Sequence, residues 1–142
     1  MSVAESVALG SGYPRRGRLI SWKGVRQMAA EALSSVAPHL DVDAPISSLS
    51  RADRSLVAIA RALYAKSEVL VLDEPTASLH ANDCEHLFSV LRQLRNEGVA
   101  IVYVSHRLDE IFKVADRVAV LRDGRLVADD SLQAFTPAAI VE

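Results

Sequence analysis

The spacing of apolar positions changes along the chain, from helical periodicity in the first half to strand-length apolar runs in the second. In the first half it predicts three helices, at residues 3–9, 22–36 and 51–63. A serine suited to cap a helix N-terminus precedes each of them, at Ser2, Ser21 and Ser50. Residues 10–18 hold three glycines, a proline and three arginines, a composition that predicts an exposed loop.

The second half alternates between apolar runs and helical segments. Strands are predicted at Val69–Asp73, Val99–Val104 and Arg117–Leu121, with helices between them at 82–96 and 108–114. Continuous apolar strands separated by helices predict a parallel sheet covered on both faces, with right-handed crossovers. The fold class is therefore α/β.

Two turn signals complete the C-terminal part. Asp123-Gly124 predicts a hairpin that adds an antiparallel edge strand at Leu126–Val127. Thr136-Pro137 has the form of an N-cap followed by the first residue of a helix, which predicts a final helix.

Apolar residues at helical spacing define the expected buried faces. They are Trp22, Val25, Ala29, Ala32, Leu33 and Val36 in the second helix, Leu56, Ile59, Ala60 and Leu63 in the third, and Leu87, Phe88, Val90, Leu91 and Leu94 in the fourth.

Composition excludes several classes of protein. A chain of 142 residues with net charge −2 is one domain and has no basic footprint for nucleic acid. No apolar run reaches the roughly 20 residues of a membrane span, and the N-terminus does not resemble a signal peptide. The single Cys84 suits a reducing compartment, and the four histidines lack the spacing of a metalloenzyme site.

The run Val69–Pro75 ends in two acids and a proline. A buried strand places its last residue at the carboxyl edge of a parallel sheet, where such folds bind ligands. Asp73 can hold Mg²⁺ there, and Glu74 can act as general base toward an attacking water. The alternative is a strand that merely ends in a polar turn.

Two further features have similar alternatives. The segment Leu49–Asp53 starts a helix with a serine hydroxyl and free N–H groups, which suits an anion or an ordinary cap. His106 follows the second strand and can donate a hydrogen bond to a phosphate, or it can simply cover the strand end.

The order and spacing of these features resemble the ATP-binding cassette (ABC) ATPases. Leu49–Asp53 resembles the ABC signature, Leu70–Pro75 the Walker B motif with its catalytic glutamate, Thr76–His80 the D-loop, and His106 the switch histidine. The stretch from Val102 to Arg125 is similar to carbohydrate importer ATPases of the ribose, galactose and xylose type, and Asp73–Leu79 resembles their first cassette rather than their second.

This resemblance implies part of a P-loop NTPase core with a mostly parallel sheet, a C-terminal antiparallel hairpin and part of the helical subdomain. Residues 1–65 would form the helical and signature region, and residues 66–142 the region from Walker B through the switch to the C-terminal core. It further implies Mg²⁺ on Asp73, catalysis by Glu74 and His106, and contacts from Ser50, Arg51 and Ala52 to ATP bound by a partner cassette.

The same resemblance implies a set of partners and a location. These are transmembrane permease subunits, a second cassette and, indirectly, a sugar-binding protein, at the cytoplasmic face of the membrane.

The chain departs from the family pattern in three places. It contains no G-x-x-x-x-G-K-[ST] loop, because Gly12–Leu19 has the glycine spacing without the lysine or the hydroxyl. The chain is thus expected to begin mid-cassette, to expose apolar faces, and to be poorly soluble or marginally stable on its own. In the signature, Ala52 and Asp53 replace glycine and glutamine, and His80 replaces the usual small or acidic D-loop residue.

Three functions remain open at this stage. The first is part of an ATPase that drives sugar import and is inactive alone without the phosphate loop. The second is a non-catalytic partner that contributes a degenerate signature in trans. The third, an ABC ATPase outside transport, is disfavoured by the negative charge and by the sequence around His106.

Overall fold

The computed structural model describes residues 1–77 and 79–135. Its elements, in chain order, are α1 (Val3–Ser11), β1 (Arg15–Arg16), β2 (Leu19–Ile20), α2 (Trp22–Leu33), the 3₁₀ turn η1 (Ile46–Ser48), α3 (Arg51–Tyr64), β3 (Val69–Asp73), α4 (Ala81–Asn96), β4 (Ala100–Val104), α5 (Leu108–Val114), β5 (Arg117–Arg122), β6 (Arg125–Ser131) and the 3₁₀ turn η2 (Leu132–Ala134). The final helix predicted at Thr136-Pro137 lies outside the described residues. No helix among these residues has both the length and the apolar character that crossing a membrane requires.

The three predicted serine caps are confirmed. Ser2 and Glu5 form a full capping box, in which the Ser2 hydroxyl accepts from the Glu5 amide at 3.2 Å and the Glu5 carboxylate accepts from the Ser2 amide at 2.7 Å. The hydroxyl of Ser21 accepts from Gly24 at 3.3 Å, and that of Ser50 from Asp53 at 3.0 Å. These hydrogen bonds satisfy amides that would otherwise be unpaired in the first helical turn.

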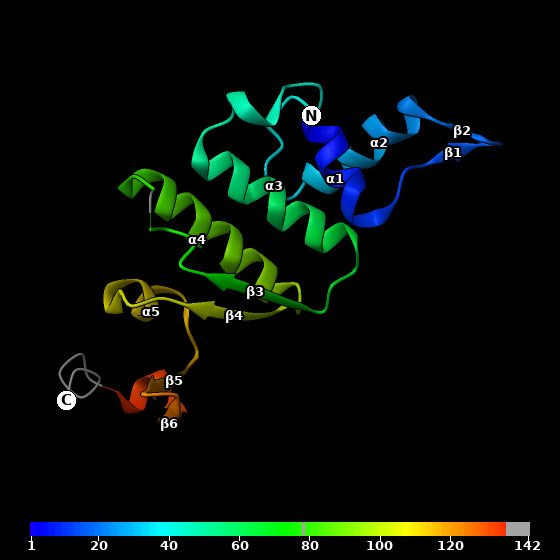
Figure 1. Cartoon of the computed structure of the whole chain (residues 1–142). Coiled ribbons are helices and arrows are strands. Elements are labelled where there is room, and N and C mark those ends of the chain that lie inside the picture. The colour runs from blue at the N-terminus through cyan, green and yellow to red at the C-terminus, as the bar shows by residue number, and fades with distance from the viewer. Residues whose placement is uncertain (78, 136–142) are drawn as a thin grey trace.

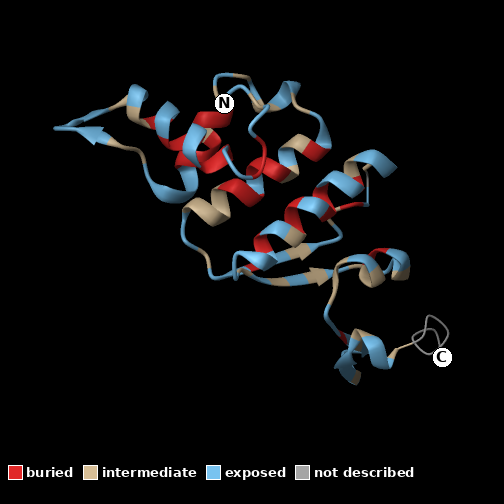
Figure 2. Cartoon of the chain, turned by 180° about the vertical axis from the view of Figure 1, so that it is seen from behind, coloured by how far each residue is buried: buried red, intermediate tan, exposed pale blue. Residues whose placement is uncertain are grey.

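Helices α1, α2 and α3 pack together and hold much of the buried apolar surface, as Figures 1 and 2 show. The predicted stripe on α2 is confirmed at Val25, Ala29, Ala32 and Leu33, whereas Trp22 is half exposed. On α3, Leu56, Ile59 and Ala60 are buried and Leu63 is partly buried. The packing of α2 is therefore that of a core-facing helix.

The loop predicted at residues 10–18 is only partly irregular. Helix α1 continues to Ser11, and β1 pairs antiparallel with β2 around Gly17, whose φ of 64° is typical of glycine in a tight turn. No helix starts directly after Gly17, because α2 begins only at Trp22 behind its cap Ser21. The segment Gly12–Leu19 thus has the structure of a surface hairpin.

Strands β3 and β4 form the parallel pair that the apolar runs predict, with Leu70 opposite Ile101 and Leu72 opposite Tyr103. Helix α4 connects them and packs on β4 and α3. All five predicted apolar positions of α4 are buried. The helix ends at Asn96, and the chain turns away at Gly98, where φ is 91° and the amide of the next residue, Val99, donates to the carbonyl of Leu94 at 3.1 Å.

The expectation of a sheet covered on both faces is wrong for the described residues. Leu70 and its neighbours on the same face pack into the core, whereas alternate positions point away from it. These alternate side chains are 47% to 64% exposed and form one face, here named the open sheet face: Val69, Val71, Val102 and Val104. Two strands and one connecting helix supply only one covering layer (Figure 2).

The third predicted strand does not join the parallel sheet. Among the residues that the structure describes, strand β5 pairs only with β6, antiparallel, and it lies apart from β4 in Figure 1. The hairpin itself is confirmed, since Asp123 and Gly124 have φ of 51° and 72°, the geometry of a type I′ turn. The fold is thus α/β with separate small parallel and antiparallel sheets.

Candidate active site

The carboxyl ends of β3 and β4 lie side by side, as expected for neighbouring parallel strands. Asp73, the last residue of β3, is the register partner of Val104, the last residue of β4. The amide of Glu74 donates to the carbonyl of Val104 at 2.9 Å, which continues the strand pairing by one residue. This pairing brings the segment after Asp73 and the segment that contains His106 to the same edge.

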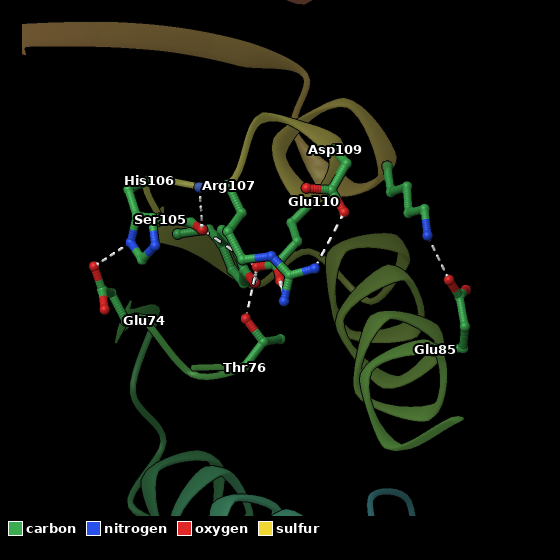
Figure 3. A network of polar contacts seen from close by, with 10 residues as sticks. Glu74, Thr76, Glu85, Ser105, His106, Arg107, Asp109 and Glu110 are labelled. Atoms are coloured by element: carbon green, nitrogen blue, oxygen red, sulfur yellow. Dashed lines mark hydrogen bonds and ion pairs between the residues drawn. The ribbon is translucent and has the colours of Figure 1, made fainter. Parts of the chain in front are cut away.

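Glu74 and His106 are in direct contact (Figure 3). The Nδ1 atom of His106 lies 2.6 Å from Oε1 of Glu74, and both side chains are substantially exposed, 71% for the histidine and 46% for the glutamate. Because a carboxylate only accepts hydrogen bonds, Nδ1 must carry the proton, and among the described residues Nε2 has no hydrogen-bond partner. A pair this exposed adds only about 0–1 kcal/mol to stability.

The backbone at Glu74 is in an unusual conformation. Its φ is 43°, in the left-handed region that costs a non-glycine residue about 1–2 kcal/mol. The hydrogen bonds from its amide to Val104 and from the amide of Ala77 to its carbonyl, at 2.9 and 3.2 Å, hold this geometry. Strain of this kind is typical of functional positions.

A buried polar network lies next to this pair. Oε2 of Glu110 accepts hydrogen bonds from Thr76 at 2.6 Å, Tyr103 at 2.7 Å and Ser105 at 3.2 Å. Its other oxygen, Oε1, lies 3.0 Å from Nη1 of Arg107, although the two are not aligned as a hydrogen bond. Glu110 is only 2% exposed, so these contacts compensate for the removal of a charge from water.

The network changes the chemistry of Tyr103. Burial raises the pKa of its phenol above the ordinary value, and the hydrogen bond to the Glu110 carboxylate raises it further. Sequence reasoning missed Glu110, because an acid beside Asp109 in a short helix is usually exposed.

The signature-like residues lie at the start of α3. Ser50 and Arg51 are exposed, whereas the side chain of Ala52 is buried. The Ser50 hydroxyl donates to Oδ2 of Asp53 at 2.8 Å and accepts from the Asp53 amide as the helix cap. Both of its hydrogen bonds are therefore made with Asp53. No contact among the described residues joins Ser50 to Glu74 or His106.

Asp53 places a negative charge at the same helix end. Partial burial acts to raise its pKa, but hydrogen bonds to His39, at 3.0 Å, and to Ser50 outweigh it, and the pKa is lowered from its usual value. The carboxylate therefore stays ionised beside the first amides of α3, where it is also favoured by the helix dipole.

Asp73 is the one predicted metal ligand. Its carboxylate is exposed at the strand end, and the described residues contain no group of three or more histidine, cysteine, aspartate or glutamate side chains that could hold a metal by themselves. Mg²⁺ is usually bound by one or two carboxylates, with phosphate and water oxygens as the other ligands. A single exposed aspartate fits that mode and does not fit a metal cage built only from protein.

Comparison with known proteins gives matches in sequence over most of the chain. The family described as ABC transporter matches residues 2–77. The ribose import ATP-binding protein RbsA 2 of Rubrobacter xylanophilus is 47% identical over an alignment of 142 positions, which covers 99% of this chain and 27% of that protein. The fructose import ATP-binding protein FruK of Bifidobacterium longum is 43% identical over 131 residues, 91% of this chain and 25% of that protein. The chain thus spans about a quarter of the length of these curated relatives.

Solved structures agree at the level of the fold. An ABC transporter of the metal-chelate type, in an inward-facing conformation, superposes with a TM-score of 0.85 at 21% identity. The superposition covers 99% of this chain and 56% of that chain.

Proposed function

This chain belongs to the ABC transporter family, and we propose that it forms part of an ATP-binding subunit that drives sugar import. The observation that carries the proposal is the contact of Glu74 with His106 at 2.6 Å, beside Asp73, where two parallel strands end. A carboxylate and an imidazole at this edge can together hold a water molecule and a phosphate. The names of the relatives, which import ribose and fructose, support a sugar as the transported substrate.

Each of the three residues has a distinct role in this proposal. Asp73 binds Mg²⁺, which neutralises charge on the phosphates of ATP. Glu74 accepts the proton of the attacking water as general base. His106 donates from Nδ1 to Glu74 and, as an imidazolium, would also donate from Nε2 to the terminal phosphate.

The start of α3 has a separate role, toward a second cassette. Ser50, Arg51 and the backbone of Ala52 would contact ATP held by that partner, since a helix N-terminus favours anions. The Asp53 carboxylate already occupies this end and repels a phosphate, so we expect this contact to be weaker than one made by a neutral residue. The further partners would be permease subunits and, indirectly, a sugar-binding protein, at the cytoplasmic face of the membrane.

The 142 residues contain no phosphate-binding loop, so we expect no ATP hydrolysis by this chain alone. The test starts from the reading frame upstream of the Met1 codon. If that frame encodes G-x-x-x-x-G-K-[ST], the longer chain is expressed and its ATP hydrolysis measured beside the variants Glu74→Gln and Glu85→Gln. We expect Glu74→Gln to lower kcat by about 10²–10⁴-fold.

Glu85→Gln is the matched control, because Glu85 is an exposed carboxylate that pairs with Lys113 at 2.6 Å, and it should leave the rate unchanged. Hydrolysis that survives Glu74→Gln would contradict the assignment of the base. An upstream frame without the loop would instead favour the non-catalytic partner, tested by binding of this chain to a complete cassette.

A further inference from the structure

Glu110 is a buried carboxylate that the proposed chemistry does not use. It is the one buried residue of α5, the helix that follows His106. The helix is therefore attached to the end of the sheet through a charged group rather than through a fully buried apolar side chain. Burying a carboxylate costs several kcal/mol unless partners compensate, so its partners show what the arrangement stabilises.

The partners of Glu110 come from both segments that carry the candidate catalytic pair (Figure 3). Thr76 lies two residues after Glu74, in the segment that follows β3. Ser105 lies directly before His106, and Arg107 directly after it. The hydroxyl of Ser105 also accepts from the Arg107 amide at 3.1 Å, which closes a turn around His106.

One carboxylate thus joins two chain segments that strand pairing alone leaves free. The hydrogen bond from the Glu74 amide to Val104 is the last described step of the β3–β4 pairing. Beyond it, the contact of Thr76 with Glu110, at 2.6 Å, fixes the segment after Glu74 relative to Ser105. Without this contact, the Glu74 and His106 side chains, both exposed, have little other packing to keep them together.

We propose that Glu110 is a positioning residue that holds the segments after β3 and β4 together so that Glu74 and His106 face each other. The catalytic meaning of this pair rests on the proposed function, but the positioning does not. The observable consequence is the tautomer of His106. Neutral His106 must carry its proton on Nδ1 to donate to Glu74, whereas released from that contact it is free to carry the proton on Nε2.

The experiment is a long-range ¹H–¹⁵N NMR correlation of the histidine rings in the 142-residue chain, recorded at about pH 8.5 so that the neutral tautomers are observed. His39 supplies an internal control, because it faces Asp53 through Nε2 at 3.0 Å and should show the opposite tautomer. The variants are Glu110→Gln, Thr76→Val and, as a control, Glu85→Gln, which removes another ion pair of α5, with Lys113, without touching the hydrogen bonds of Glu110.

We expect His106 to be mainly the Nδ1–H form in the unmodified chain and in Glu85→Gln, and to lose most of that preference in Glu110→Gln and Thr76→Val. The His39 signals should stay unchanged throughout. Thr76→Val keeps the side-chain shape and replaces the hydroxyl with a methyl group, so it remains informative if Glu110→Gln fails to fold. Unchanged His106 signals in folded Thr76→Val would overturn the proposal. No nucleotide is involved, so loss of the proposed ATPase role would leave this result standing.

Discussion

At the scale of single residues, Tyr103 connects the buried network to a quantity that is easily measured. Its phenol is partly buried and donates to Glu110 at 2.7 Å. Burial and this hydrogen bond both favour the neutral phenol, so its pKa is raised above the usual value of about 10. In the unfolded chain the Tyr103 phenol ionises at a lower pH than in the folded chain. The free energy of unfolding therefore falls as the pH rises above about 10.

We expect Glu110→Gln to lower the pKa of Tyr103, because the substitution removes a negative charge and a charged acceptor from the phenol while leaving it partly buried. Phenolate absorbance followed during an alkaline titration measures this change. The variant Tyr103→Phe identifies which step of the titration belongs to Tyr103. A Tyr103 step that is the same with and without the Glu110 carboxylate would contradict the role of the hydrogen bond.

The sequence predicts the placement of Glu74 and His106 well but not the surroundings that hold them. Parallel strands put their carboxyl ends at one edge, so two residues that follow neighbouring strands must be close. Glu110 could not be found this way, since its burial depends on hydroxyls at Thr76, Tyr103 and Ser105 that are distant or unremarkable in sequence. Burial of a charge is decided by its partners, and partners are a property of the tertiary structure.

At the scale of elements, the N-terminus of α3 combines a cap with a signature-like sequence. We expect Ser50→Ala to lower the unfolding free energy by about 1 kcal/mol, because the Asp53 amide loses its acceptor. Chemical denaturation measures the change. The control is Ser55→Ala in the same helix, where the hydroxyl only donates back to the carbonyl of Arg51 at 3.2 Å. Equal effects of the two substitutions would show that the cap contributes nothing specific.

Strand pairing shows where sequence reasoning ends at this scale. The apolar run at β5 predicts a strand, and Asp123-Gly124 predicts its hairpin with β6, both correctly. The apolar pattern does not predict which strand pairs with the second edge of β5. Alternation of side chains along a strand determines which of them share a face, but not which strand lies alongside. Within the described residues β5 has no partner other than β6, and the predicted three-stranded parallel sheet is not formed.

At the scale of the whole molecule, apolar burial is uneven. The helices α1 to α4 carry most of the core, whereas the open sheet face exposes four valines on two adjacent strands. An apolar patch of adjacent side chains favours association, and unpaired strand edges add to this tendency. The expected poor solubility of this chain on its own thus has a defined structural location.

We expect the chain to associate in a concentration-dependent way and to bind a hydrophobic dye. The double substitution Val71→Thr with Val102→Thr should reduce both, because these two residues are register partners at the centre of the open sheet face and threonine keeps the strand propensity. Val127→Thr on β6 is the matched control, being exposed to a similar extent outside that face. Sedimentation velocity measures the association. A monomeric chain with a sharp cooperative melt and no dye binding would refute the expectation.

The left-handed backbone at Glu74 implies a conflict between what folding favours and what the proposed chemistry requires. Asparagine tolerates φ of 43° better than glutamate or glutamine does, so Glu74→Asn should be more stable than Glu74→Gln by several tenths of a kcal/mol to about 1 kcal/mol. Both variants lack the carboxylate, so thermal or chemical denaturation of the two measures how much the left-handed backbone at residue 74 contributes to stability. Equal stabilities would show that the position is unstrained. Glutamate at this position therefore lowers the stability of the fold, and the proposed role of its carboxylate would account for that cost.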